Sequence, residues 1–108
     1  MYTSPEDVKE IFVLMQDIRE GKISRNKNYY TLAKSKEYNR FKRAKLLISL
    51  IEDLEKVAIV SGGKVDLGKN EDLVEVSLYN PSLKYTRKVC LTEAELDLIK
   101  SQTTAIHY

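Results

Sequence analysis

The chain has 108 residues, the length of one domain and too short for two. An apolar fraction of 43% and a charged fraction of 31% are typical of a globular protein and argue against disorder throughout the chain. The net charge is only +2, but it is unevenly distributed along the chain.

The chain carries no feature of an exported or membrane-spanning protein. No apolar run approaches the roughly 20 residues that a membrane-spanning helix needs. The first residues show neither the basic region nor the apolar region of a signal peptide. Cys90 is the only cysteine, so no disulfide can form within one chain. We therefore expect a cytoplasmic protein without a membrane span.

Residues 5–20 are predicted to form the first helix. Ser4 is a good N-cap, Pro5 suits the first helical position, and Gly21 follows as a stop. Apolar residues recur at spacings of three and four, which predicts a face directed at the core. These residues are Val8, Ile11, Phe12, Met15 and Ile18.

A polar loop at 22–28 precedes a second helical stretch at 29–56. One apolar stripe runs along this stretch, but Glu37 falls in its middle. A carboxylate on a core stripe is costly unless it is paired. Either Glu37 meets a base across the core, or the helix breaks near 35–37 and a longer helix begins near Tyr38.

Residues 46–54 form the leucine-rich half of this helix, with apolar side chains over more than half of its circumference. A helix that is apolar on most sides is buried on most sides. We expect it to lie between the first helix and the sheet, or else to form an oligomer interface.

The pattern then changes to that of strands. Residues 57–60 and 64–67 are predicted as short strands around the turn 61–63, and 68–72 as a loop. Residues 73–79 and 83–91 alternate and predict an antiparallel hairpin, with Leu83, Tyr85, Val89 and Leu91 on one face of the second strand. Thr92-Glu93-Ala94-Glu95 is a capping box that opens a short helix.

Helices followed by grouped strands predict an α+β fold with three or four antiparallel strands and a short C-terminal helix. We expect a single domain over 1–108. Its parts are a helical region at 1–56, strands at 57–91, the short helix at 92–101 and a tail at 102–108.

The side chains that carry most enzyme chemistry are scarce. His107 is the only histidine and Cys90 the only cysteine, so a structural zinc site and the nucleophile–histidine arrangements lack their residues. Gly62-Gly63-Lys64 lacks the spacing of a phosphate-binding loop. Acidic residues at 66–75 do not match a calcium loop. We therefore expect a non-enzymatic protein with no metal and no cofactor.

The positive charge is concentrated in residues 22–45, which hold nine bases against Glu37 alone, a net charge of +8. The regions on either side each carry −3. Tyrosine and phenylalanine alternate with the bases, and this combination favours nucleic acid, since bases neutralise phosphates and aromatics stack on nucleobases. The predicted binding residues are Arg25, Lys27, Lys34, Lys36, Arg40, Lys42 and Arg43.

The element order over residues 5–91 resembles a winged helix-turn-helix, with 38–56 as its recognition helix. The resemblance is topological, no family motif supports it, and the helix is long for that role. The alternative is an adapter or inhibitor that docks on another protein. Such a protein would use its basic face on an acidic surface, or self-associate through the leucine-rich half of the second helix.

Overall fold

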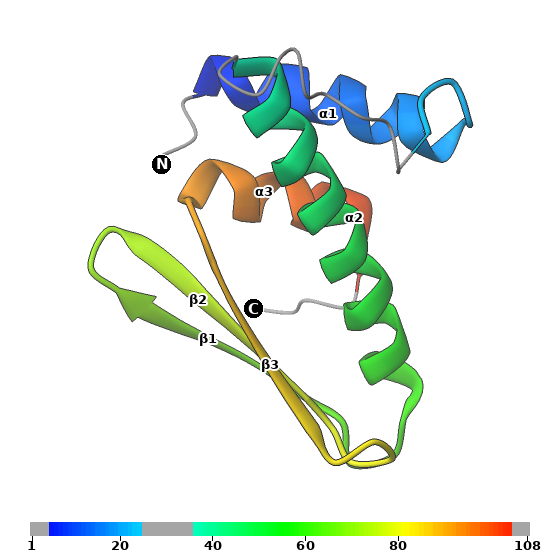
Figure 1. Cartoon of the computed structure of the whole chain (residues 1–108). Helices are drawn as coiled ribbons and strands as arrows, with labels where there is room; N and C mark the ends of the chain where they lie inside the picture. The colour runs from blue at the N-terminus through cyan, green and yellow to red at the C-terminus, as the bar shows by residue number, and fades with distance from the viewer. Residues whose placement is uncertain (1–4, 25–35, 105–108) are drawn as a thin grey trace.

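The computed structural model describes residues 5–24 and 36–104, which form an α+β fold (Figure 1). Three helices accompany a three-stranded antiparallel sheet, as the sequence predicted. In chain order the elements are α1 (Pro5–Arg19), α2 (Lys36–Ile59), β1 (Lys64–Asn70), β2 (Leu73–Asn80), β3 (Tyr85–Leu91) and α3 (Glu93–Gln102).

α1 agrees with the predicted first helix to within one residue. Glu6 and Asp7 stand in its first turn, where the helix dipole favours negative charge. Ile11, Met15 and Ile18 are buried, and α1 packs on α2. Gly21 follows the helix with φ of 79°, the left-handed conformation that glycine adopts at low cost. The predicted N-cap lies outside the described residues.

α2 is described from Lys36 onward, and residues 25–35 lie outside the described part of the chain, so both alternatives for the start of the second helix stay predictions. Any shorter helix before it lies outside the described residues. At its other end α2 continues to Ile59, so the strand predicted at 57–60 is wrong. Val57 is 5% exposed and extends the buried line of Leu50 and Leu54 at helical spacing. The run was too short to distinguish a strand from a helix end.

The sheet is a meander in the order β1-β2-β3. β1 is longer than predicted and extends through residues 68–70, which were predicted as loop. Asn70 pairs with Leu73, so only two residues make the first hairpin turn, and Glu71 there has φ of 57°. Pairs such as Leu78 with Arg87 and Val76 with Val89 fix the register of β3.

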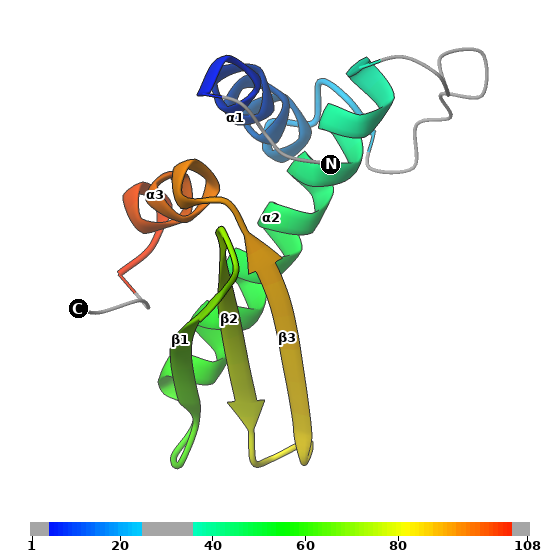
Figure 2. The ribbon, with the colours of Figure 1, turned by 90° about the vertical axis from the view of Figure 1, so that its left-hand side faces the viewer.

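Two layers result (Figure 2). α2 crosses the molecule: its first half lies beside α1, and its second half covers one face of the sheet (Figures 1 and 2). α3 lies beyond the end of the sheet, close to α1 and α2. The sheet residues that face α2 are the buried ones, Val74, Val76 and Leu78 among them. Their neighbours in sequence point away from α2, to the uncovered face.

The leucine-rich half of α2 is buried within the chain. Leu47, Ile48, Leu50, Ile51 and Leu54 are each no more than 1% exposed and belong to one core cluster with residues of α1, the sheet and α3. Burial between the first helix and the sheet was one of the two predicted alternatives. These side chains consequently offer no surface to a second copy of the chain.

Candidate functional site

Arg40, a residue of the predicted basic surface, contacts carboxylates of its own chain. Its Nε and Nη2 atoms donate to Oδ1 of Asp7 at 3.0 and 2.8 Å, and its Nη1 forms an ion pair with Glu10. The Arg40 side chain is 18% exposed. These contacts fix α2 against α1, and they neutralise the guanidinium locally.

Arg43 contacts a carboxylate of α3. Its Nε donates to Oε2 of Glu95 at 2.8 Å and its Nη2 to Oε1 at 2.6 Å. This two-bond geometry is the strongest that arginine makes with a carboxylate. The Glu95 side chain is 1% exposed, and its Oε1 also accepts the backbone N–H of Thr92 in the predicted capping box.

The remaining predicted bases are only partly described. Lys42 is exposed, and its Nζ lies 4.8 Å from the centre of the Tyr38 ring. Lys45, in the same basic stretch, lies 5.3 Å from the Phe41 ring. Arg25, Lys27 and Lys34, and the side chain of Lys36, lie outside the described part of the chain. Of the seven predicted binding residues, the side chains that the structure describes are therefore one exposed lysine, Lys42, and two internally paired arginines.

A different surface stands out at the end of the molecule far from α1. Five large apolar side chains are exposed among the described residues, and four of them come from segments that meet at this end. They are Ile59, Tyr79, Leu83 and Tyr85. Leu83 and Tyr85 matter most for the site described below, and their exposed fractions are 72% and 54%. Tyr79 follows Leu78 in β2 and so points to the face of the sheet away from α2, whereas Leu83 and Tyr85 lie on the α2 side.

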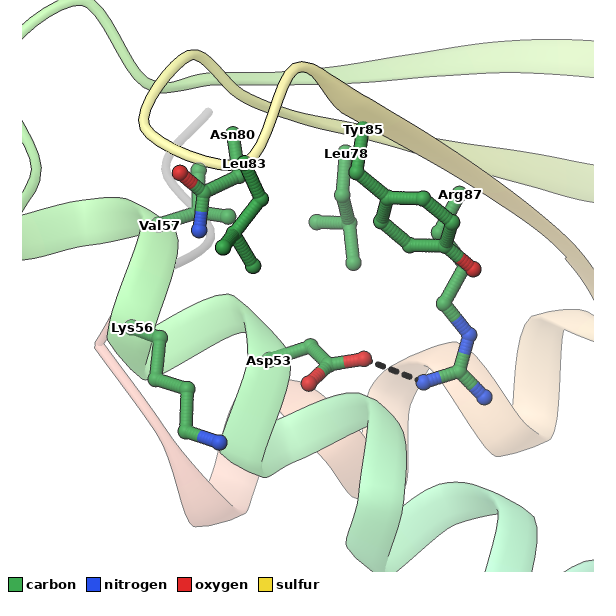
Figure 3. A pocket seen from close by; sticks show the side chains of 8 residues that line it. All are labelled: Asp53, Lys56, Val57, Leu78, Asn80, Leu83, Tyr85 and Arg87. Carbon is green, nitrogen blue, oxygen red and sulfur yellow. Dashed lines mark hydrogen bonds and ion pairs between the residues drawn. The ribbon is translucent and has the colours of Figure 1, made fainter.

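Leu83 and Tyr85 border a pocket between α2 and the second hairpin, which we call the distal pocket (Figure 3). Val57 and Leu78 supply its buried apolar wall. The residues that line the distal pocket are Asp53, Lys56, Val57, Leu78, Asn80, Leu83, Tyr85 and Arg87.

The 81–84 turn holds Leu83 at the pocket. The Asn80 side-chain oxygen accepts the backbone N–H of Ser82 at 3.0 Å, an Asx turn, and Lys84 has φ of 49°. The loop after α2 supports the turn: a Cβ placed on Gly62 would lie 3.5 Å from the Pro81 ring. Leu83 is therefore held in place by local turn chemistry while its side chain stays exposed.

Charge at the distal pocket is partly compensated. Nη1 of Arg87 forms an ion pair with Asp53 and donates to the Ser49 hydroxyl at 3.1 Å. Figure 3 shows Asp53 reaching from α2 toward Arg87, with the Tyr85 ring beside it. Lys56 is exposed and has no ion pair with any described residue. The three charged residues of the pocket thus carry a net charge of +1.

The volume of the distal pocket, about 130 Å³, limits what it can hold. Pockets for cofactors and drug-sized ligands measure roughly 300–1,000 Å³, whereas a cavity of about 150 Å³ accommodates one benzene ring. The distal pocket therefore has the size of a single apolar side chain. That size favours an anchor residue of a protein partner over a metabolite.

No metal-binding group is found in the described residues: no three histidine, cysteine, aspartate or glutamate side chains are placed to hold an ion. Cys90 is half-buried in β3, where Asn70 Nδ2 donates to its Sγ at 3.7 Å. His107 lies beyond the described part of the chain. Among the described helices, none is both long and apolar enough to cross a membrane.

Comparisons with protein-family models, curated proteins and solved structures give no match to this chain. The winged-helix resemblance of the element order stays a prediction.

The sequence did not indicate the distal pocket. Leu83 and Tyr85 were grouped with the core residues Val89 and Leu91 on one strand face, but β3 begins only at Tyr85 and the core ends at Val89. The turn-forming residues Asn80-Pro81-Ser82 just before Leu83 were the available clue, because they place that leucine in the turn.

Proposed function

We propose that this chain is a non-enzymatic protein-binding domain that receives an apolar side chain of its partner in the distal pocket. The observation that carries the proposal is the pairing of a side-chain-sized cavity with two exposed residues, Leu83 and Tyr85, at its mouth. Interfaces concentrate their binding energy in a few well-packed side chains, most often tryptophan, tyrosine and arginine. The distal pocket offers Tyr85 and Arg87 with an apolar wall behind them.

Nucleic-acid binding through residues 22–45 is still a prediction, and we place it second. Of its predicted residues, Arg40 and Arg43 hold α1 and α3 against α2 through buried or half-buried ion pairs. A phosphate would have to compete with these carboxylates. The charge reversal of both arginines, an obvious test of binding, would also place acids against acids and destabilise the fold.

A capture experiment with matched variants tests the proposal. The purified chain is immobilised and exposed to a nuclease-treated lysate, and the captured proteins are quantified for wild type, Leu83→Asp and Val13→Asp. Val13 is 55% exposed on α1, at the other end of the molecule, so its substitution controls for loss of an exposed apolar group. We expect Leu83→Asp to remove a defined subset of proteins that Val13→Asp retains.

Affinity for one captured protein, once purified, is then measured by calorimetry. Loss of an anchor contact predicts about tenfold weaker binding for Leu83→Asp and for Tyr85→Ala. Identical capture by wild type and Leu83→Asp would refute the proposal. Capture that is seen with a parallel untreated lysate but disappears on nuclease treatment would instead support the nucleic-acid prediction.

A further inference from the structure

If the proposed protein-binding function holds, the charged residues of the distal pocket indicate which charge its partner carries. Among the described residues, Asp53 is the only acid that lines the pocket, and it is engaged by Arg87. Lys56 lines the same pocket, is exposed and has no ion pair within the described residues. A partner at the mouth of the pocket would therefore meet an uncompensated positive charge.

A second lysine adds to this field from the turn that carries Leu83. Lys84 is exposed, and it too lacks an ion pair with any described residue. Lys64 begins β1 and is likewise exposed without such a pair, but it is the register partner of Tyr79 and so points to the face of the sheet away from α2. Three lysines thus lie at this end of the molecule, in contrast to the internally paired arginines near α1.

We propose that the distal pocket binds a peptide segment in which a large aliphatic or aromatic residue lies next to an aspartate or glutamate. The apolar side chain packs against Val57, Leu78 and Leu83, which excludes water from the pocket. The adjacent carboxylate lies at the mouth, where Lys56 and the outer edge of Arg87 attract it. A lysine or arginine in that position would instead meet like charge.

Defined peptides test this chemistry on the full chain. Amide shifts of the ¹⁵N-labelled protein are followed on addition of the capped tetrapeptide acetyl-Ala-Leu-Glu-Ala-amide. One analogue replaces its glutamate by lysine, and another replaces its leucine by glycine. We expect the acidic peptide to shift the amides of Leu83, Tyr85 and Arg87. It should bind about threefold to tenfold more tightly than the lysine analogue, as expected for exposed charges. The glycine analogue should leave these amides unchanged.

Variants of two exposed lysines on the same helix separate this site from general charge effects. Lys56→Glu should reverse the preference between the acidic and basic peptides. Lys45→Glu changes the net charge equally but lies in the half of α2 beside α1. It should leave the preference intact. Equal response to the two lysine variants would overturn the assignment of the charge effect to the pocket.

The remaining outcomes are also decisive. Equal binding of the acidic and basic peptides, or no shift at the pocket with any peptide, overturns the inference. A thymidine 20-mer that shifts the same amides while the peptides do not would overturn it in favour of nucleic acid. If Leu83→Asp still abolishes protein capture in those cases, the proposed function survives and only the partner chemistry is wrong.

Discussion

Removal of the Arg43 guanidinium should destabilise the fold strongly, because it leaves a buried carboxylate without its cation. In Arg43→Met the apolar stem is retained and the charge is lost. Glu95 is 1% exposed, so water cannot replace the two hydrogen bonds it accepts from Arg43. Breaking a buried ion pair on one side costs about 3–5 kcal/mol. Since Arg43 is 25% exposed, we expect the lower end, about 3 kcal/mol.

A loss of this size is large against the roughly 5–15 kcal/mol that stabilise a typical domain. It should appear in urea unfolding followed by circular dichroism as a lower midpoint with an unchanged slope. Thermal unfolding should shift downward by roughly 15 °C. Lys42→Met is the matched control on the same helix. Lys42 is exposed, so its substitution should change stability by about 0.5 kcal/mol or less.

The double variant Arg43→Met with Glu95→Met gives the sharpest check. Two apolar residues of similar volume remove the unpaired charge, so the double variant should be more stable than Arg43→Met alone by about 2 kcal/mol. Loss of the Glu95 contact to the Thr92 N–H offsets part of the gain by about 1 kcal/mol. If the double variant proves less stable than the single one, the carboxylate is not the source of the cost.

Three further predictions follow from other contacts. Gly63→Ala should lower the free energy of unfolding measured in urea by about 2 kcal/mol or more, because a Cβ there would lie 2.3 Å from a backbone oxygen of α2. Gly68→Ala is the control: it has open space around it and should be close to neutral. In Lys69→Gln, an NMR titration should show the pKa of Glu93 rising toward its ordinary value, because the Lys69 hydrogen bond and charge lower it. The Lys69–Glu93 contact contributes little to the stability of the fold, because both groups are exposed. This contribution is present at pH values above the ordinary pKa of a carboxyl group, and it is lost as the pH falls through the lowered pKa of Glu93. Arg40→Met should cost about 1–2 kcal/mol, with protease cleavage increased in α1, and unchanged cleavage there would contradict its role in fixing that helix.

Local signals in the sequence were enough to predict much of the fold. The capping box at 92–95, the apolar stripe of α1 and the alternation of β2 each depend on neighbouring residues, and each is present in the structure. The end of α2 was missed because four apolar residues fit a buried strand as well as the last turn of a helix. Only packing of Val57 against the core distinguishes the two.

The candidate site depended on contacts that a sequence pattern does not contain. Arg40 and Arg43 were assigned to a partner-facing surface because they belong to the strongly basic segment 22–45. Their carboxylates lie 33 and 52 residues away in the chain, and only the packing of α1 and α3 on α2 brings the groups together. A position that is polar by helical periodicity can thus face another element as well as water.

The position of Glu95 has a consequence for how the molecule folds. One carboxylate begins α3 through the capping box and also joins that helix to the first half of α2, across 52 residues of chain. Local helix initiation and long-range assembly therefore share a single group. α3 should consequently exchange its amide hydrogens with deuterium together with α2, as one cooperative foldon, and a fragment that ends after β3 should lack part of the cooperativity of the intact chain.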